Sequence, residues 1–144
     1  MTRTSRARSM AALLFVALSL ACTSRGTSMP PKDTPNTRLA VDFAKAVASR
    51  DSTRAHGFLA SKLQSVLTPE TLAAQYDEMV AYGSGAPTII QVITTMEAWP
   101  DKQPADTEWV YVAIANDTYS EAVTVVVAEE KSRLVIRSIE WGRP

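Results

Sequence analysis

The chain contains one cysteine and one histidine among its 144 residues, and this scarcity limits the chemistry that it can support. Cys22 has no second cysteine with which to form an internal disulfide. A zinc site with several histidine ligands cannot be built from His56 alone. We therefore predict no metal and no cofactor, and we expect His56 to lie in a solvated or boundary position.

The sequence also lacks an excess of basic charge, a glycine-rich loop and a long apolar run. Its 15 basic residues equal its 15 acidic residues in number, which argues against binding of nucleic acid. None of its five glycines belongs to a glycine-rich loop between a strand and a helix, so nucleotide-binding motifs are absent. The apolar stretch over residues 10–21 has 12 residues, whereas a membrane-spanning helix needs about 20.

The N-terminal residues have the layout of a secretory signal, with a basic start, a short apolar stretch and a small residue before a cleavage point. With Ala21 before the cut and Cys22 after it, the segment resembles the lipobox of bacterial lipoproteins. This resemblance implies that residues 1–21 are removed and that the Cys22 thiol is linked to diacylglycerol. Ordinary secretion is the alternative, because residues 19–21 also fit a small-x-small cleavage site.

The residues that follow the signal suggest where the protein is held. Thr23 follows the cysteine in place of Asp, which resembles sorting to the periplasmic face of the outer membrane in a Gram-negative host. Residues 22–37 hold three prolines and almost nothing apolar, which predicts a disordered tether that spans about 20–25 Å. Removal of the signal leaves 12 basic and 15 acidic residues, a net charge of −3. Residues 38–144 are long enough for one small domain.

The periodicity of apolar residues changes once along this domain, from that of helices to that of strands. Helices are expected after caps at Asn36 or Thr37, at Asp51 and at Thr68, with a turn between the second and the third. Residues rich in Ile, Val and Thr then predict strands, and short connections imply antiparallel neighbours. These strands cover residues 88–99, 108–115, 121–128 and 134–141. The prediction is an α+β fold, with three N-terminal helices packed on a curved four-stranded antiparallel sheet.

This order of elements resembles the nuclear transport factor 2-like cone, which is a cystatin-like fold. The resemblance rests on the helix at residues 51–59, on residues 67–72, and on a last strand that ends in Ile139-Glu140-Trp141. It is strongest to small bacterial envelope members of undefined function, and it implies a cavity between the helices and the concave face of the sheet. The superfamily includes isomerases, dehydratases and cyclases as well as non-catalytic binding domains, so the fold does not decide the function.

Catalysis in such a cavity requires a carboxylate as general base and a hydroxyl or protonated acid that stabilises an enolate. The acids within apolar stretches are Asp42, Glu97 and Glu140, and Tyr111 is the candidate hydroxyl. Each of these acids also fits a solvent-facing position on an amphipathic helix or strand. The sequence therefore offers these four residues as catalytic candidates and keeps a purely structural role open for each.

Aromatic residues are the candidates for binding an apolar ligand. Trp109 and Tyr111 share one face of their strand, whereas Val110 and Val112 share the other, and alternation alone leaves open which face is concave. The same aromatics also fit a core or an interface, including a homodimer through the outer face of the sheet. The binding candidates are Tyr76, Trp99, Trp109 and Tyr111.

These observations predict a lipid-anchored envelope protein, attached through Cys22, with a non-catalytic domain that binds a small apolar ligand or docks another envelope protein. The first alternative is an isomerase, dehydratase or cyclase that uses a buried carboxylate and a tyrosine. The second alternative is a structural spacer without a ligand. A partner nucleic acid is not expected.

Overall fold

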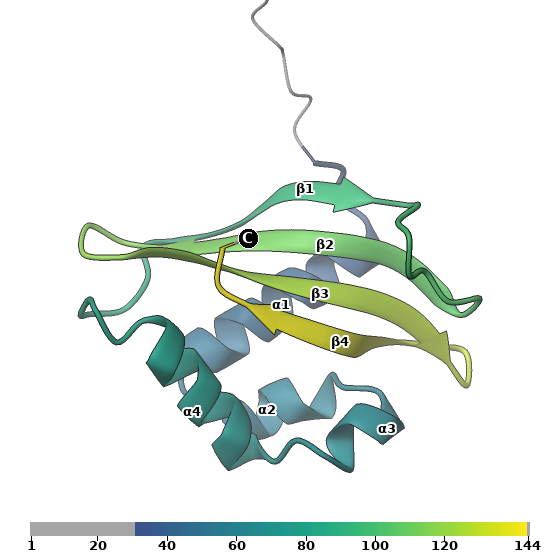
Figure 1. The fold of residues 1–144 in the computed structure, drawn as a ribbon, viewed down its shortest axis with the longest axis horizontal. Coiled ribbons are helices and arrows are strands. Elements are labelled where there is room, and N and C mark those ends of the chain that lie inside the picture. The colour runs from purple at the N-terminus through teal and green to yellow at the C-terminus, as the bar shows by residue number, and fades with distance from the viewer. Residues whose placement is uncertain (1–30, 144) are drawn as a thin grey trace, which may run out of the picture.

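Residues 31–143, which a computed structural model describes, form four helices followed by a four-stranded sheet (Figure 1). The strands follow one another in chain order and pair antiparallel, so the predicted α+β fold is confirmed. The sheet is open and not closed into a barrel. The elements are α1 (Pro35–Ala48), α2 (Ser52–Gly57), α3 (Ser61–Gln64), α4 (Pro69–Met79), β1 (Ile89–Met96), β2 (Asp106–Ala115), β3 (Ser120–Glu130) and β4 (Arg133–Trp141).

The predicted signal peptide (residues 1–21), the predicted lipid attachment at Cys22 and the tether up to residue 30 lie outside the described residues. Helix α1 begins at Pro35, earlier than predicted, and the cap at Asn36 or Thr37 was wrong. Thr34 is the cap, because its hydroxyl accepts from the Thr37 amide at 3.2 Å while its own amide donates to the Thr37 hydroxyl at 2.9 Å. Pro35 fits the first helical turn, where no amide proton is needed.

The other two predicted helix starts are confirmed. The Asp51 carboxylate accepts from the Arg54 amide at 3.1 Å, and the Thr68 hydroxyl accepts from the Thr71 amide at 3.2 Å. The predicted turn between these two helices contains the one-turn helix α3, so the described chain has four helices where three were expected.

Strand β1 ends at Met96, and the prediction that it extends to Trp99 was wrong. In the turn that follows the strand, the Lys102 ammonium lies 5.2 Å from the centre of the Trp99 ring and donates to the Glu97 carbonyl at 2.5 Å. Residues 97–105 thus form a loop that joins β1 to β2.

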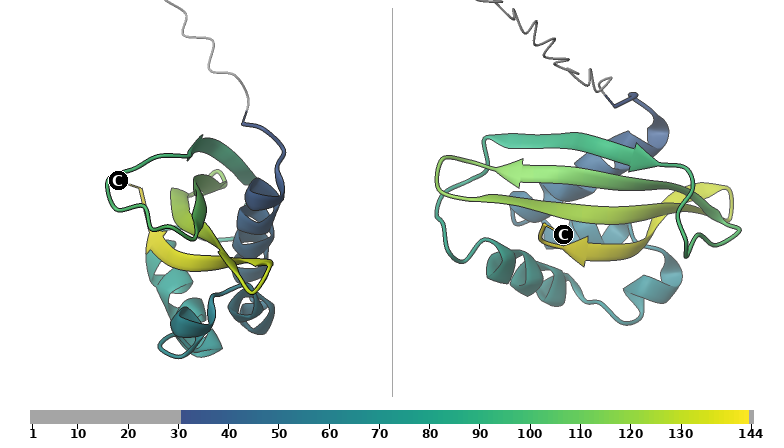
Figure 2. Two further views of the ribbon diagram at one scale, coloured as in Figure 1. Left: turned by 90° about the vertical axis from the view of Figure 1, so that its right-hand side faces the viewer. Right: turned by 45° about the horizontal axis from the view of Figure 1, so that its top comes forward.

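Helix α1 lies across one face of the sheet, which identifies the inner face that the sequence left open, and α2, α3 and α4 lie toward the β4 edge (Figure 1 and Figure 2). Helix α1 contacts all four strands, and α2 and α4 pack against α1. Val110, Val112 and Ile114 of β2 are fully buried on this inner face, whereas Trp109 and Tyr111 alternate with them and face outward. The inner side of the core is made by Ala40, Phe43, Ala44, Val47, Ala55, Leu59, Leu72, Tyr76, Val123, Val125, Val127 and Ile136.

The connection between α2 and α3 pairs with the edge strand β4 and joins the helices to the sheet. The Ile136 amide donates to the Phe58 carbonyl at 2.8 Å, and the Ala60 amide donates to the Ile136 carbonyl at 2.8 Å. Leu59, between them, is buried and forms a parallel bridge with Ile136. This pairing covers part of the β4 edge, which would otherwise present unpaired backbone groups.

An ion pair between Asp106 and Arg137 spans the sheet from β2 to β4, across the intervening strand β3. The guanidinium donates from Nε to Oδ1 at 2.5 Å and from Nη2 to Oδ2 at 2.8 Å, while the Gln103 amide also donates to Oδ2 at 2.8 Å. The Asp106 side chain is completely buried. Register shifts next to Asp106 and at Arg137 re-aim the two side chains toward each other.

We expect Arg137→Ala to lower the free energy of unfolding by about 3 kcal/mol, because it leaves the Asp106 carboxylate buried without its counter-charge. Urea unfolding followed by circular dichroism measures this change. Arg38→Ala is the matched control, since Arg38 makes the same two-point contact with Asp33 on the exposed surface, and it should leave the stability nearly unchanged. Equal effects of the two substitutions would contradict the prediction.

Candidate functional site

The three predicted catalytic acids lie apart from one another and in solvent. Asp42 is exposed on α1, Glu97 is exposed just after β1, and Glu140 is exposed on β4. Glu140 pairs with Thr124 of β3, which in turn pairs with Tyr111 of β2, so this acid and this hydroxyl share the outer face on strands that are not neighbours. The described part of the chain therefore does not bring these acids together around an interior cavity.

The space between α1, α4 and the inner face of the sheet is occupied by fully buried side chains, among them Phe43, Leu72 and Val112. Besides the ion-paired Asp106, the buried carboxylate of β2 is that of Glu108, which is only 7% exposed and accepts from the Thr34 hydroxyl at 3.3 Å. Sequence reasoning did not select Glu108, although its alternation with Val110 and Val112 was a signal that could have placed it on the same face.

Tyr76, a predicted binding residue, lies in the core on α4 and is 2% exposed. Burial, and then hydrogen bonding with the Tyr119 hydroxyl, raise the pKa of the Tyr76 phenol above its ordinary value of 10.0. The Arg50 guanidinium lies 5.3 Å from the centre of the Tyr76 ring and forms an ion pair with Asp77. These contacts make Tyr76 a packed core residue of the interior side of α4.

The outer face of the sheet carries a cluster of large apolar side chains from β1 and β2, some exposed and some half-buried. Trp109 and Tyr111 stack with ring centres 6.1 Å apart and an angle of 8° between the rings. Met96 pairs with Trp109 across the two strands and is 38% exposed, and Ile93, at a bulge in β1, is 46% exposed. We call these four residues the outer-sheet patch. It contains two predicted binding residues, Trp109 and Tyr111, whereas Trp99 lies in the adjoining loop.

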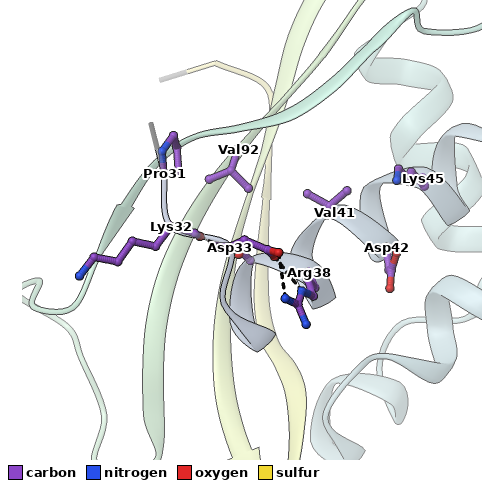
Figure 3. Close-up of a pocket in the computed structure, with 9 residues that line it drawn as sticks. Pro31, Lys32, Asp33, Arg38, Val41, Asp42, Lys45 and Val92 are labelled. Atoms are coloured by element: carbon purple, nitrogen blue, oxygen red, sulfur yellow. Dashed lines mark hydrogen bonds and ion pairs between the residues drawn. The ribbon is translucent and has the colours of Figure 1, made fainter. Parts of the chain in front are cut away.

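A groove of about 390 Å³ lies between α1, the segment that precedes it and β1 (Figure 3). Asp42 lines this groove, and on the helix it has Arg38 four residues before it and Lys45 three residues after it. The Arg38 guanidinium donates to both oxygens of Asp33 at 2.7 and 2.8 Å, and these hydrogen bonds lower the pKa of the Asp33 carboxyl. The groove, which we call the α1 groove, thus carries charges of both signs, and Asp42 lies between Arg38 and Lys45 along the helix.

A second cavity of about 390 Å³ lies between the C-terminal half of α4, the start of β3 and the end of β4. We call it the α4–β4 cavity. Trp141 lies in its wall and donates from its indole nitrogen to the Gln75 side-chain oxygen at 2.9 Å. In the sequence, Trp141 served only as part of the end of the last predicted strand, and no local pattern connected this residue with α4. The residues that line the cavity are Gln75, Glu78, Met79, Glu121, Trp141 and Gly142.

Over residues 31–143, no group of three or more His, Cys, Asp and Glu side chains is arranged to hold a metal ion. Within the same part of the chain, no helix is long and apolar enough to span a bilayer. Comparison with family models, with curated proteins and with solved structures finds no match for this chain.

We expect the protein to lose stability as the pH rises above about 10, because the Tyr76 pKa is higher in the folded than in the unfolded chain. The contribution of Tyr76 to the free energy of unfolding is fully present below its pKa in the unfolded chain. It is lost as the pH rises from there toward the higher pKa of Tyr76 in the folded chain. Melting temperatures of the wild type and of Tyr76→Phe, measured between about pH 8 and about pH 12, test this expectation. The decline should be shallower in Tyr76→Phe than in the wild type. Identical slopes in the two proteins would refute it.

Proposed function

We propose that the chain is a lipid-anchored envelope protein whose folded domain is non-catalytic and docks a protein through the outer-sheet patch. The observation that carries the proposal is the exposure of Ile93 and Met96 beside the half-buried Trp109 and Tyr111, whose alternation with the buried Val110 and Val112 puts them on the face away from the core. Neighbouring large apolar side chains of this kind are characteristic of protein interfaces. The arrangement of helices on one face of an antiparallel sheet also supports our inference of a nuclear transport factor 2-like cone.

The chemistry of the patch supports an interface more than a water-facing surface. Trp and Tyr supply large contact areas with few rotatable bonds, and they are the residues most often responsible for binding energy at interfaces. Burial of apolar surface yields about 25 cal/mol per Å², so exposure of these side chains to water is unfavourable until a partner covers them. A structural spacer has no need of such a surface.

The partner that we propose first is a second copy of the chain. The four patch residues carry no charge, so two patches can pack about a two-fold axis without repulsion between like charges. Anchoring at Cys22 would confine all copies to one membrane surface and increase their encounter. A different envelope protein or a small apolar ligand would use the same uncharged surface.

We do not extend the proposal to an isomerase, dehydratase or cyclase. The candidate acids Asp42, Glu97 and Glu140 are exposed and separate, and the buried carboxylate of Glu108 is already bonded to Thr34. A general base for carbon chemistry works best in a dry cavity near a hydroxyl that stabilises the enolate. The described interior is occupied by apolar side chains instead.

We expect Cys22→Ala to move the protein from the membrane fraction to the soluble fraction without changing its melting temperature, because the anchor is separate from the core. Residues 19–21 also fit ordinary signal cleavage, so the variant should still be cut. Fractionation of the producing cells and the intact mass of the purified wild type provide the measurement. A wild-type mass without a diacylglyceryl group, or a variant that stays with the membranes after cleavage, would contradict the anchor.

For the docking surface, a photo-crosslinking amino acid placed at Met96 of the full-length protein should yield a covalent dimer in intact cells. The same group at Glu70, which is exposed at the start of α4, is the control and should yield none. Trp109→Ser, in the Met96-labelled protein, should reduce the dimer at least tenfold, because it removes an interface tryptophan. The absence of a dimer from the Met96-labelled protein, or an equal yield from both positions, would overturn the proposal.

A further inference from the structure

The α4–β4 cavity combines an aromatic wall with negative charge, and its six lining residues include no basic side chain. Its carboxylates belong to Glu78, exposed on α4, and to Glu121, half-buried at the start of β3. Met79 and Trp141 supply the apolar part of the lining. The α1 groove differs, because Lys32, Arg38 and Lys45 line it together with its acids.

The indole of Trp141 is held in place from two directions. Its nitrogen donates to the Gln75 side-chain oxygen on α4 at 2.9 Å. Its ring lies 6.1 Å from the ring of the buried Phe43, at an angle of 41°. An indole that is fixed by a hydrogen bond and by packing offers a preformed surface to a ligand, since little side-chain freedom remains to be lost on binding.

The carboxylate of Glu121 is also oriented before any ligand arrives. The Tyr82 hydroxyl donates to Oε1 of Glu121 at 2.7 Å, and the Ser120 amide donates to the same hydroxyl at 3.1 Å. Gly142, with a φ of +90°, lines the cavity next to the second oxygen, and a Cβ at this glycine would lie 3.9 Å from Oε2. Among the described residues no hydrogen bond to Oε2 is found, and Gly142 places no side chain beside it.

These contacts point to a ligand class. A carboxylate with one open oxygen attracts a cation, and an indole attracts a cation through its ring electrons when the charge is carried by an organic group. A bare divalent metal ion would need more oxygen ligands than this lining provides. We propose that the α4–β4 cavity binds an alkylammonium group, with Glu121 and Glu78 facing its charge and Trp141 and Met79 contacting its alkyl carbons.

A titration with choline and with its neutral isostere 3,3-dimethylbutan-1-ol tests this proposal. The probe protein is the full-length chain in an uncharged detergent, with Trp99→Phe and Trp109→Phe, so that Trp141 is its only tryptophan. Choline should change the Trp141 fluorescence in a saturable way and bind at least tenfold more tightly than the isostere. Equal binding of the two compounds, or no binding of choline, would overturn the proposal.

Variants separate the cation site from a general effect of charge. Glu121→Gln should weaken choline binding at least fivefold, whereas Glu129→Gln, an exposed acid next to the β3–β4 turn, should leave it unchanged. Circular dichroism verifies that each variant is folded. Nα-acetyl-lysine amide, titrated in parallel, distinguishes a lysine side chain of a protein from a free quaternary amine as the natural source of the ammonium group. An unchanged affinity in Glu121→Gln would reject the assignment.

Discussion

Strand β3 is covered on both faces, although the helices lie against only one of them. Residues 122–128 are all buried, and on the outer face Val126 lies opposite Trp109 while Thr124 lies opposite Tyr111. The stacked Trp109 and Tyr111 therefore shield β3 from water on the outer face, while their own side chains stay partly exposed. The Asp106–Arg137 pair crosses over this same strand and holds its two neighbours in register. The positions of both edges of the sheet depend on how β3 is covered.

In the described residues, the apolar core fills the interior, and the accessible aromatic and charged side chains lie on the surface. The interior between helices and sheet is close-packed, and its polar groups, such as the Glu108 carboxylate and the Tyr76 hydroxyl, are bonded to protein partners. The outer sheet and the end of α4 carry the aromatic groups that remain accessible. This arrangement is the basis of our proposal of recognition at a surface.

Much of the fold could be predicted from the sequence because local signals suffice for it. The capping residues Asp51 and Thr68 predict the starts of their helices, and the Val-rich segments predict the strands of the sheet. The end of β1 at Met96 was not predicted, because the apolar run continues through Ala98 and Trp99. The cap at Thr34 was missed, although Thr34-Pro35 carries the same local signal as Thr68-Pro69. Alternation grouped Trp109 with Tyr111 but could not say which face the helices cover. The α4–β4 cavity joins residues 75, 121 and 141, whose proximity no local pattern encodes.

The bridge between Leu59 and Ile136 has a consequence for the order in which the chain can fold. It joins the connection between the second and third helices to the last strand, so the contact spans most of the domain in sequence. Contacts between such distant positions form late, because a long loop must close first. During synthesis the helices emerge early but lack the strand that covers Leu59 until the C-terminal residues leave the ribosome. For a chain that we propose to be exported, this order leaves Leu59 uncovered until β4 has been synthesised.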